Sequence, residues 1–191
     1  MAFDFDGTLT DRDTFIEFIK FSRGFGPFFV GFLRFLPLLA LMKMGLYPNW
    51  KAKQRVFSHF YRGMSVESFD AFCRDFCKER LPRMLRPSML RKIAEYAGRD
   101  CELCIVSASI DRWIRPWAQT VGFSSLLCTE IEVEKGVLTG AFLTANCYGQ
   151  EKVNRLLTRY PERNEYYLIA YGDSRGDREL LAFADESYYG V

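Results

Sequence analysis

The feature that most constrains the fold is the alternation of two kinds of segment after residue 86. Short apolar runs that are typical of buried strands alternate there with segments in which apolar side chains recur every three or four residues, as in helices. The predicted strands are 101–106, 126–134, 137–143, 166–171 and 186–191, and the predicted helices are 89–97, 110–121, 151–160 and 178–184. This alternation favours an α/β fold, with a parallel sheet covered by helices on both faces.

A helical segment interrupts the alternation after the first strand. Residues 1–5 form a short apolar run, and residues 14–85 carry mainly helical patterns. The chain has 191 residues, enough for one domain or for one domain with a sizeable insertion. We therefore predict an α/β core formed by residues 1–13 and 86–191, with residues 14–85 inserted as a helical cap domain.

The near-neutral charge of the chain conceals two unlike parts. Lys and Arg number 26 and Asp and Glu number 24, but residues 18–66 hold eight basic residues and no acidic residue. The rest of the chain carries 18 basic and 24 acidic residues, a net charge of −6. The whole chain therefore lacks the basic footprint of a nucleic-acid-binding protein, and we expect no nucleic-acid partner.

The cysteines and the first residues indicate a reducing compartment. Two carboxylates stand near the start, where a secretory signal would carry a basic and then an apolar run. We therefore expect a cytoplasmic protein with free thiols. A zinc site formed by Cys73, Cys77, Cys101 and Cys104 is the alternative, but Cys104 runs into an apolar stretch, so ordinary buried thiols are the favoured interpretation.

Reactive side chains follow the predicted strands at the positions where ligands bind in open α/β sheets. They are Asp4 and Asp6 after the first strand, Ser107 after strand 101–106, Asp173 and Asp177 after strand 166–171, and Lys152 at the start of a helix. Converging carboxylates repel one another unless a cation neutralises them, and hard oxygen ligands suit Mg²⁺. One carboxylate can attack phosphorus while a second transfers protons, and hydroxyl and ammonium groups can bind the phosphoryl oxygens. The set therefore indicates phosphoryl transfer.

These motifs resemble those of the haloacid dehalogenase-like superfamily of phosphohydrolases. The sequence DFDGTLT at 4–10 is similar to the first motif, VSAS at 106–109 to the second, Lys152 to the third and GDSRGD at 172–177 to the fourth. The placement of the cap between the first two motifs resembles the phosphoserine phosphatase-like subfamily. The resemblance implies a Rossmann-like core, a helical cap and a Mg²⁺-dependent phosphomonoester hydrolase.

The resemblance also implies a role for each site residue. Asp4 would be the nucleophile that forms an aspartyl phosphate, and Asp6 would be the general acid and base. Mg²⁺ would be held by Asp4, the main-chain carbonyl of Asp6 and Asp173, with support from Asp177, and phosphate would be bound by Thr8, Ser107 and Lys152.

The basic, aromatic segment 25–62 leaves two interpretations open. In one, it is a helical cap that packs its own core with Lys and Arg outside. In the other, it contacts an anionic membrane peripherally at the inner face, because apolar side chains accompanied only by cations suit anionic headgroups. Pro27, Pro37 and two cations divide the segment into short pieces, so we predict no transmembrane helix.

Three functions are compatible with these observations. The first is a phosphatase of a phosphorylated lipid headgroup such as phosphatidylglycerophosphate. It is implied by the layout around residues 148–152, which is similar, more loosely, to the bacterial phosphatidylglycerophosphatases of the same subfamily. The second is a phosphatase of a soluble, phosphoserine-like metabolite. Asp13 and Gly176 depart from the phosphoserine phosphatase pattern, which has Glu and usually Asn there. The third is a non-catalytic binding protein on the same fold.

Overall fold

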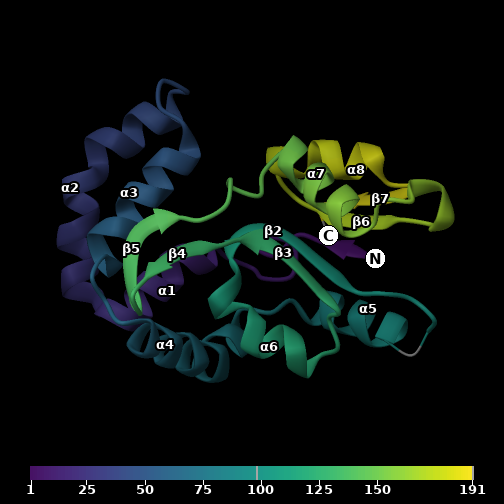
Figure 1. Ribbon diagram of the computed structural model, residues 1–191, viewed down its shortest axis with the longest axis horizontal. Coiled ribbons are helices and arrows are strands. Elements are labelled where there is room, and N and C mark those ends of the chain that lie inside the picture. The colour runs from purple at the N-terminus through teal and green to yellow at the C-terminus, as the bar shows by residue number, and fades with distance from the viewer. Residues whose placement is uncertain (98, 191) are drawn as a thin grey trace.

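Five parallel strands form the central sheet in the order β3-β2-β1-β6-β7 (Figure 1). The computed structural model describes residues 1–97 and 99–190, so the last residue of the strand predicted at 186–191 lies outside the described residues. The strands are β1 (Ala2–Phe3), β2 (Cys104–Ile110), β3 (Ser125–Thr129), β6 (Ile169–Gly172) and β7 (Glu186–Tyr189). The predicted α/β class with a parallel sheet is therefore confirmed.

Helices cover both faces of this sheet. In Figure 1, α5 (Pro87–Ala97) and α6 (Arg115–Thr120) lie below the strands, and α7 (Gln150–Arg159) and α8 (Arg178–Phe183) lie above them. Each helix buries its apolar stripe: α5 buries Met89 and Ile93, and α7 buries Val153 and Leu156. The predicted alternation thus arises because strands and helices bury their apolar faces against each other.

Four helices separate β1 from α5 in the described chain. They are α1 (Thr14–Arg23), α2 (Phe25–Lys43), α3 (Asn49–Tyr61) and α4 (Val66–Glu79). The Asp13 side chain caps α1 by accepting a hydrogen bond from the backbone amide of Ile16 at 3.1 Å, and Ser65 caps α4 in the same way from Ser68. These caps supply partners for amide groups that a helix start leaves unpaired.

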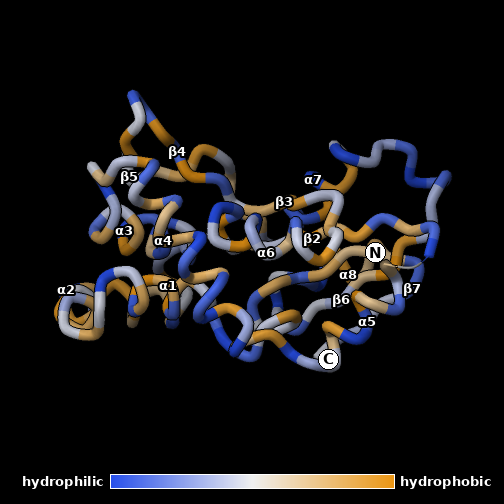
Figure 2. Tube along the Cα trace, turned by 90° about the horizontal axis from the view of Figure 1, so that it is seen from below, coloured by the Kyte–Doolittle hydropathy of each residue, from blue (hydrophilic) through white to orange (hydrophobic). Residues whose placement is uncertain are grey.

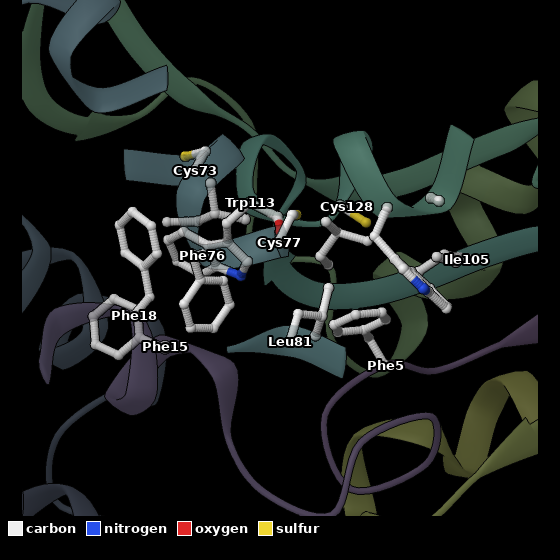
Figure 3. Close-up of a cluster of buried hydrophobic side chains, with 14 of the residues drawn as sticks. Phe5, Phe15, Phe18, Cys73, Phe76, Cys77, Leu81, Ile105, Trp113 and Cys128 are labelled. Carbon is white, nitrogen blue, oxygen red and sulfur yellow. The ribbon is translucent and has the colours of Figure 1, made fainter. Parts of the chain in front are cut away.

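The inserted helices share a hydrophobic core with the sheet. Figure 3 shows Phe18 of α1 and Phe76 of α4 beside Trp113, which follows β2, while Phe5, which follows β1, lies farther along the same cluster near Leu81. The rings of Phe18 and Trp113 stack with centroids 4.8 Å apart, and Phe18 meets Phe76 edge-on at 5.4 Å. Because these side chains belong to one buried cluster, α1 and α4 are packed directly on the sheet domain.

The strand predicted over residues 126–134 is wrong as one element. The chain leaves the sheet at Glu130, so that β4 (Ile131–Glu134) pairs instead with β5 (Val137–Phe142) in an antiparallel hairpin. This hairpin packs against α3, where the amide of Phe142 donates to Gln54 Oε1 at 3.0 Å. Both halves of the run are apolar enough for strands, and the sequence pattern alone does not show where the pairing partner changes.

The predicted division of the segment 25–43 by prolines is also wrong. α2 is one helix of 19 residues, and it is long and apolar enough, by length and composition, to cross a membrane. Pro27 lies in the first turn, where its missing N–H is not needed. Pro37 is exposed, so the carbonyl left without a partner one turn earlier can bond to water. The prediction that no segment here is long enough is therefore corrected.

The shared core predicts that the insertion and the sheet unfold together. Replacing Phe76 with Ala removes a buried ring between α1 and α4, so we expect a loss of about 3–5 kcal/mol in the free energy of unfolding. Urea unfolding followed by fluorescence and by circular dichroism should show one coincident transition. Tyr167→Ala, at a residue that is 67% exposed, is the control and should change little. Two separate transitions would contradict a shared core.

Candidate active site

The register of the sheet brings the predicted site residues to one edge. Phe3 pairs with Ile105 of β2 and with Tyr171 of β6, so Asp4 and the residues after these partners share the carboxyl ends of the strands. Ser107 was expected to follow its strand, but β2 continues to Ile110 and Ser107 lies within it, where its register with β3 shifts. The side chain of Ser107 is nevertheless buried at this edge and lines the same cavity as Asp4.

A buried ammonium group lies between two carboxylates at the centre of the site. Lys152 Nζ donates to Asp4 Oδ1 at 2.7 Å and to Asp177 Oδ1, and all three side chains are almost fully buried. Burial by itself would lower the pKa of Lys152, but the two carboxylates outweigh it and raise this pKa. Burial raises the pKa of Asp4, against the opposing charge of Lys152. Lys152 is therefore a fixed positive charge beside the predicted nucleophile.

Asp177 organises the loop that follows β6. Its Oδ2 atom accepts hydrogen bonds from the amide and hydroxyl groups of Ser174 at 2.9 and 2.7 Å and from the amide of Asp173 at 3.2 Å. Burial by itself would raise the pKa of Asp177, but the positive charge of Lys152 and the hydrogen bonds from Lys152 and Ser174 outweigh burial and lower this pKa. Asp177 thus stays charged and holds Asp173 in place.

Asp173 faces the first loop of the chain. Its Oδ1 atom accepts a hydrogen bond from Thr8 Oγ1 at 2.9 Å. Gly7, at φ +87°, passes directly beside it, and a Cβ at Gly7 would lie 2.2 Å from the Asp173 carboxylate. The hydroxyl of Thr8 is therefore engaged with a predicted metal ligand, and its predicted contact with phosphate stays a prediction.

Asp6 is held by two hydroxyl groups that the sequence did not single out as functional. Its Oδ1 atom accepts from the amide and hydroxyl of Thr14 at 2.8 and 2.6 Å, and its Oδ2 atom accepts from Ser109 Oγ. Trp113 Nε1 in turn donates to Thr14 Oγ1 at 3.2 Å. Burial, followed by the negative charge of Asp13, raises the pKa of Asp6 to about 7. Asp6 is therefore poised to give and take a proton near neutral pH.

The signals for these partners were present in the sequence but not specific. Thr14 is the first residue of a helix, and Ser109 belongs to the second motif. A hydroxyl at either position is ordinary by itself. Only the fold shows that both meet the same carboxylate.

A cavity of about 330 Å³ opens at this edge of the sheet. Asp4, Asp6, Ser107 and Lys152 line its floor, and side chains of α2 and α3 line its outer part: Phe32, Leu39, Met42 and Lys53. Lys53 Nζ donates to the carbonyl of Ala108 at 2.9 Å, which turns this cation inward. A larger cavity of about 600 Å³ lies near Met1, at the other end of the strands, and contains none of the predicted site residues.

Three carboxylates lie close enough together to hold a divalent cation. One carboxylate oxygen each of Asp4, Asp173 and Asp177 lies within 4.8 Å of the others. In the described structure, Lys152 is the cation that pairs with two of these three carboxylates, Asp4 and Asp177. One positive charge against three negative charges leaves the group with excess negative charge. Oxygen ligands of this kind fit Mg²⁺. Among the described residues, no group of cysteines lies close enough together to hold a metal in this way. The structure therefore does not favour the alternative of a zinc site formed by cysteines.

The cysteines differ from their prediction at one position. Five are buried and free, as expected, but Cys101 is exposed. The reason is that β2 begins at Cys104 and not at Cys101, so the first cysteine precedes the buried strand.

The comparison with known families agrees with this geometry. Residues 1–182 match the model of the haloacid dehalogenase-like hydrolases. The chain belongs to this family. The resemblance inferred from the four motifs is therefore confirmed, and the protein is a hydrolase.

Similar proteins cover nearly the whole chain. Protein CicA of Caulobacter vibrioides (strain NA1000 / CB15N) is 33% identical over 192 residues, which span 100% of this chain and 85% of that protein. A protein of unknown function from Bordetella pertussis Tohama I has a TM-score of 0.85 at 18% identity, with 97% of this chain and 86% of that one covered. A substrate-bound phosphoserine phosphatase has a TM-score of 0.66 at 17% identity, with 98% and 83% covered. The fold is thus that of phosphoserine phosphatase-type members of the family.

The buried ion pairs predict that Lys152 stabilises the fold as well as the site. Lys152→Met would leave Asp4 and Asp177 buried without their cation, so we expect a loss of about 3–5 kcal/mol in the free energy of unfolding, measured without divalent cations. Lys92→Met, which removes an exposed pair with Glu95, is the matched control and should cost less than about 1 kcal/mol. Equal losses in the two variants would contradict the role of Lys152.

Proposed function

We propose that this protein is a Mg²⁺-dependent phosphomonoester hydrolase that acts through an aspartyl phosphate on Asp4. The observation that carries the proposal is the pairing of two unlike carboxylates at one cavity floor. Asp4 is bound to the ammonium of Lys152, whereas Asp6 is surrounded by hydroxyl groups and has a pKa of about 7. These environments suit a nucleophile and a proton carrier respectively.

In the first step, a carboxylate oxygen of Asp4 attacks phosphorus. The bond between phosphorus and the ester oxygen breaks, and Asp6 gives its proton to that leaving oxygen. Lys152 and Ser107 lie where they would bind the phosphoryl oxygens. Thr14 and Ser109 keep the Asp6 carboxyl group aimed into the cavity throughout.

In the second step, Asp6 accepts a proton from water as that water attacks phosphorus. The bond between phosphorus and Asp4 breaks, inorganic phosphate is released and both carboxyl groups return to their first state. Asp4, the main-chain carbonyl of Asp6 and Asp173 would hold Mg²⁺, with Asp177 supporting them. Bound there, the ion would supply positive charge that offsets the repulsion between phosphate and the carboxylates.

The outer part of the cavity favours a phosphorylated lipid headgroup, such as phosphatidylglycerophosphate, as the substrate. Phe32, Leu39 and Met42 offer apolar contacts there, and Lys53 offers a second cation. Asp13, which stands in place of the Glu of phosphoserine phosphatases, also lines the cavity, but its carboxylate accepts a hydrogen bond as the cap of α1. A site of this composition suits an amphiphile better than it suits phosphoserine.

The role of Asp4 is tested by Asp4→Asn. We expect turnover of p-nitrophenyl phosphate with Mg²⁺ to fall by about a thousandfold or more, because an amide cannot form the acyl phosphate. Circular dichroism should show a retained fold. The exposed variant Asp11→Asn is the control and should keep the wild-type rate. A near-wild-type rate for Asp4→Asn would show that another residue is the nucleophile.

The substrate class is tested by a panel of phosphomonoesters. We expect a higher kcat/KM on phosphatidylglycerophosphate in mixed micelles than on phosphoserine, because the cavity wall is apolar. EDTA should abolish both activities, and added Mg²⁺ should restore them, because the oxygen ligands fit that ion. A preference for phosphoserine would favour a soluble metabolite. Hydrolysis of no member of the panel would favour a binding protein on the same fold.

A further inference from the structure

The side of α2 that faces away from the protein is an apolar surface without a protein partner in the described structure. Only 6% of its most apolar 18-residue window is buried, although the mean hydropathy there is 1.8. Figure 2 shows α2 at the outer edge of the molecule. We call this surface the outer face of α2, and its exposed side chains are Phe25, Phe29, Val30, Leu33, Leu36 and Leu41.

The opposite side of α2 is committed to the rest of the protein. Gly31 lies so close to α3 that a Cβ there would be 2.3 Å from the ring of Phe60. Phe35 contacts His59 of α3, and Phe32 lines the cavity of the active site. These contacts hold α2 along the surface of the protein and fix which of its faces points outward.

The charged side chains of α2 and α3 have one sign. No Asp or Glu occurs from residue 18 to residue 66. Arg34 and Lys43 are exposed on α2 itself, and Lys51 and Arg55 are exposed on α3. Other cations of the segment are turned inward: Lys53 bonds to the carbonyl of Ala108, and Arg23 bonds to that of Phe60. The surface available for contact is therefore smaller than residues 25–62 and centres on α2.

We propose that the outer face of α2 docks on an anionic lipid bilayer and lies within its interface. An apolar strip on a helix that carries cations and no carboxylate matches acyl chains beneath negatively charged headgroups. A second copy of the chain would match it less well, because pairing two such faces would bring Arg34 and Lys43 of each copy together. A spanning orientation would strip Gly31 and Phe32 from α3 and from the cavity.

Docking would place the active-site cavity beside the lipid surface. Phe32, Leu39 and Met42 of α2 line that cavity, while Val30 and Leu33 of the same helix are exposed. At 3.6 residues per turn, these exposed positions lie on a different side of the helix from the cavity-lining ones. Docking itself requires no phosphatase activity, so the two proposals fail separately.

The test is co-sedimentation of the full chain with vesicles of phosphatidylcholine, with and without phosphatidylglycerol. We expect binding to the anionic vesicles that weakens as salt is added. Val30→Ser with Leu33→Ser should lower the affinity on the order of tenfold or more, because two apolar contacts are lost. Arg34→Gln with Lys43→Gln should also lower it on the order of tenfold. Leu143→Ser with Tyr167→Ser, at exposed apolar positions elsewhere, is the matched control and should bind as the wild type does.

Further measurements separate docking from its rivals. Every variant should hydrolyse p-nitrophenyl phosphate at the wild-type rate, since none of these side chains lines the catalytic floor. Three results would overturn docking: no binding to anionic vesicles at low salt, a stable dimer in light scattering that Leu33→Ser dissociates, or vesicle-bound protein that resists alkaline carbonate. Vesicle binding without any hydrolysis would overturn the proposed function alone.

Discussion

The structure depends on one buried positive charge. Lys152 joins three segments that are far apart in the sequence: the end of β1 through Asp4, the loop after β6 through Asp177, and its own helix α7. Neither carboxylate could stay ionised in this interior without a cation within hydrogen-bonding distance. Asp177 then holds Asp173 through the backbone of their shared loop. These hydrogen bonds of Lys152 and Asp177 therefore join the segments at the carboxyl ends of the strands and also position the groups proposed to react.

The environment of Asp6, the proposed proton carrier, depends on the inserted helices. Thr14, the first residue of α1, donates through both its amide and its hydroxyl to Asp6. Ser109 of β2 donates to the other carboxylate oxygen of Asp6, and Trp113 Nε1 donates to the hydroxyl of Thr14. A movement of α1 away from the sheet would break these bonds and expose Asp6, which would lower its pKa toward the ordinary value. The insertion thus helps to hold Asp6 in place as well as lining the outer part of the cavity.

Periodicity predicted much of this molecule because parallel strands place their carboxyl ends together. Asp4 and Asp173 were found in that way, and Lys152 from its place at the start of a helix; the three side chains lie close together in the fold. Partner choice was less predictable. β3 holds no charged residue and β4 alternates Ile and Val with Glu, but neither pattern names its partner: β3 pairs in the sheet and β4 in a hairpin on α3. Pro37 did not end α2, because its exposed position makes the missing hydrogen bond inexpensive. Thr14 and Ser109 are common residues whose role appears only when the chain is folded.

The exposure of α2 has a physical origin in its two apolar sides. A surface helix normally carries one apolar stripe and one polar face. α2 uses one side to pack against α3 and to wall the cavity, and its outer face is apolar as well. Pairing the outer face with lipid would satisfy the hydrophobic effect without altering the inner packing. Under the two proposals, the acidic core would gather carboxylates around a cation, and the basic insertion would meet a surface of negative charge.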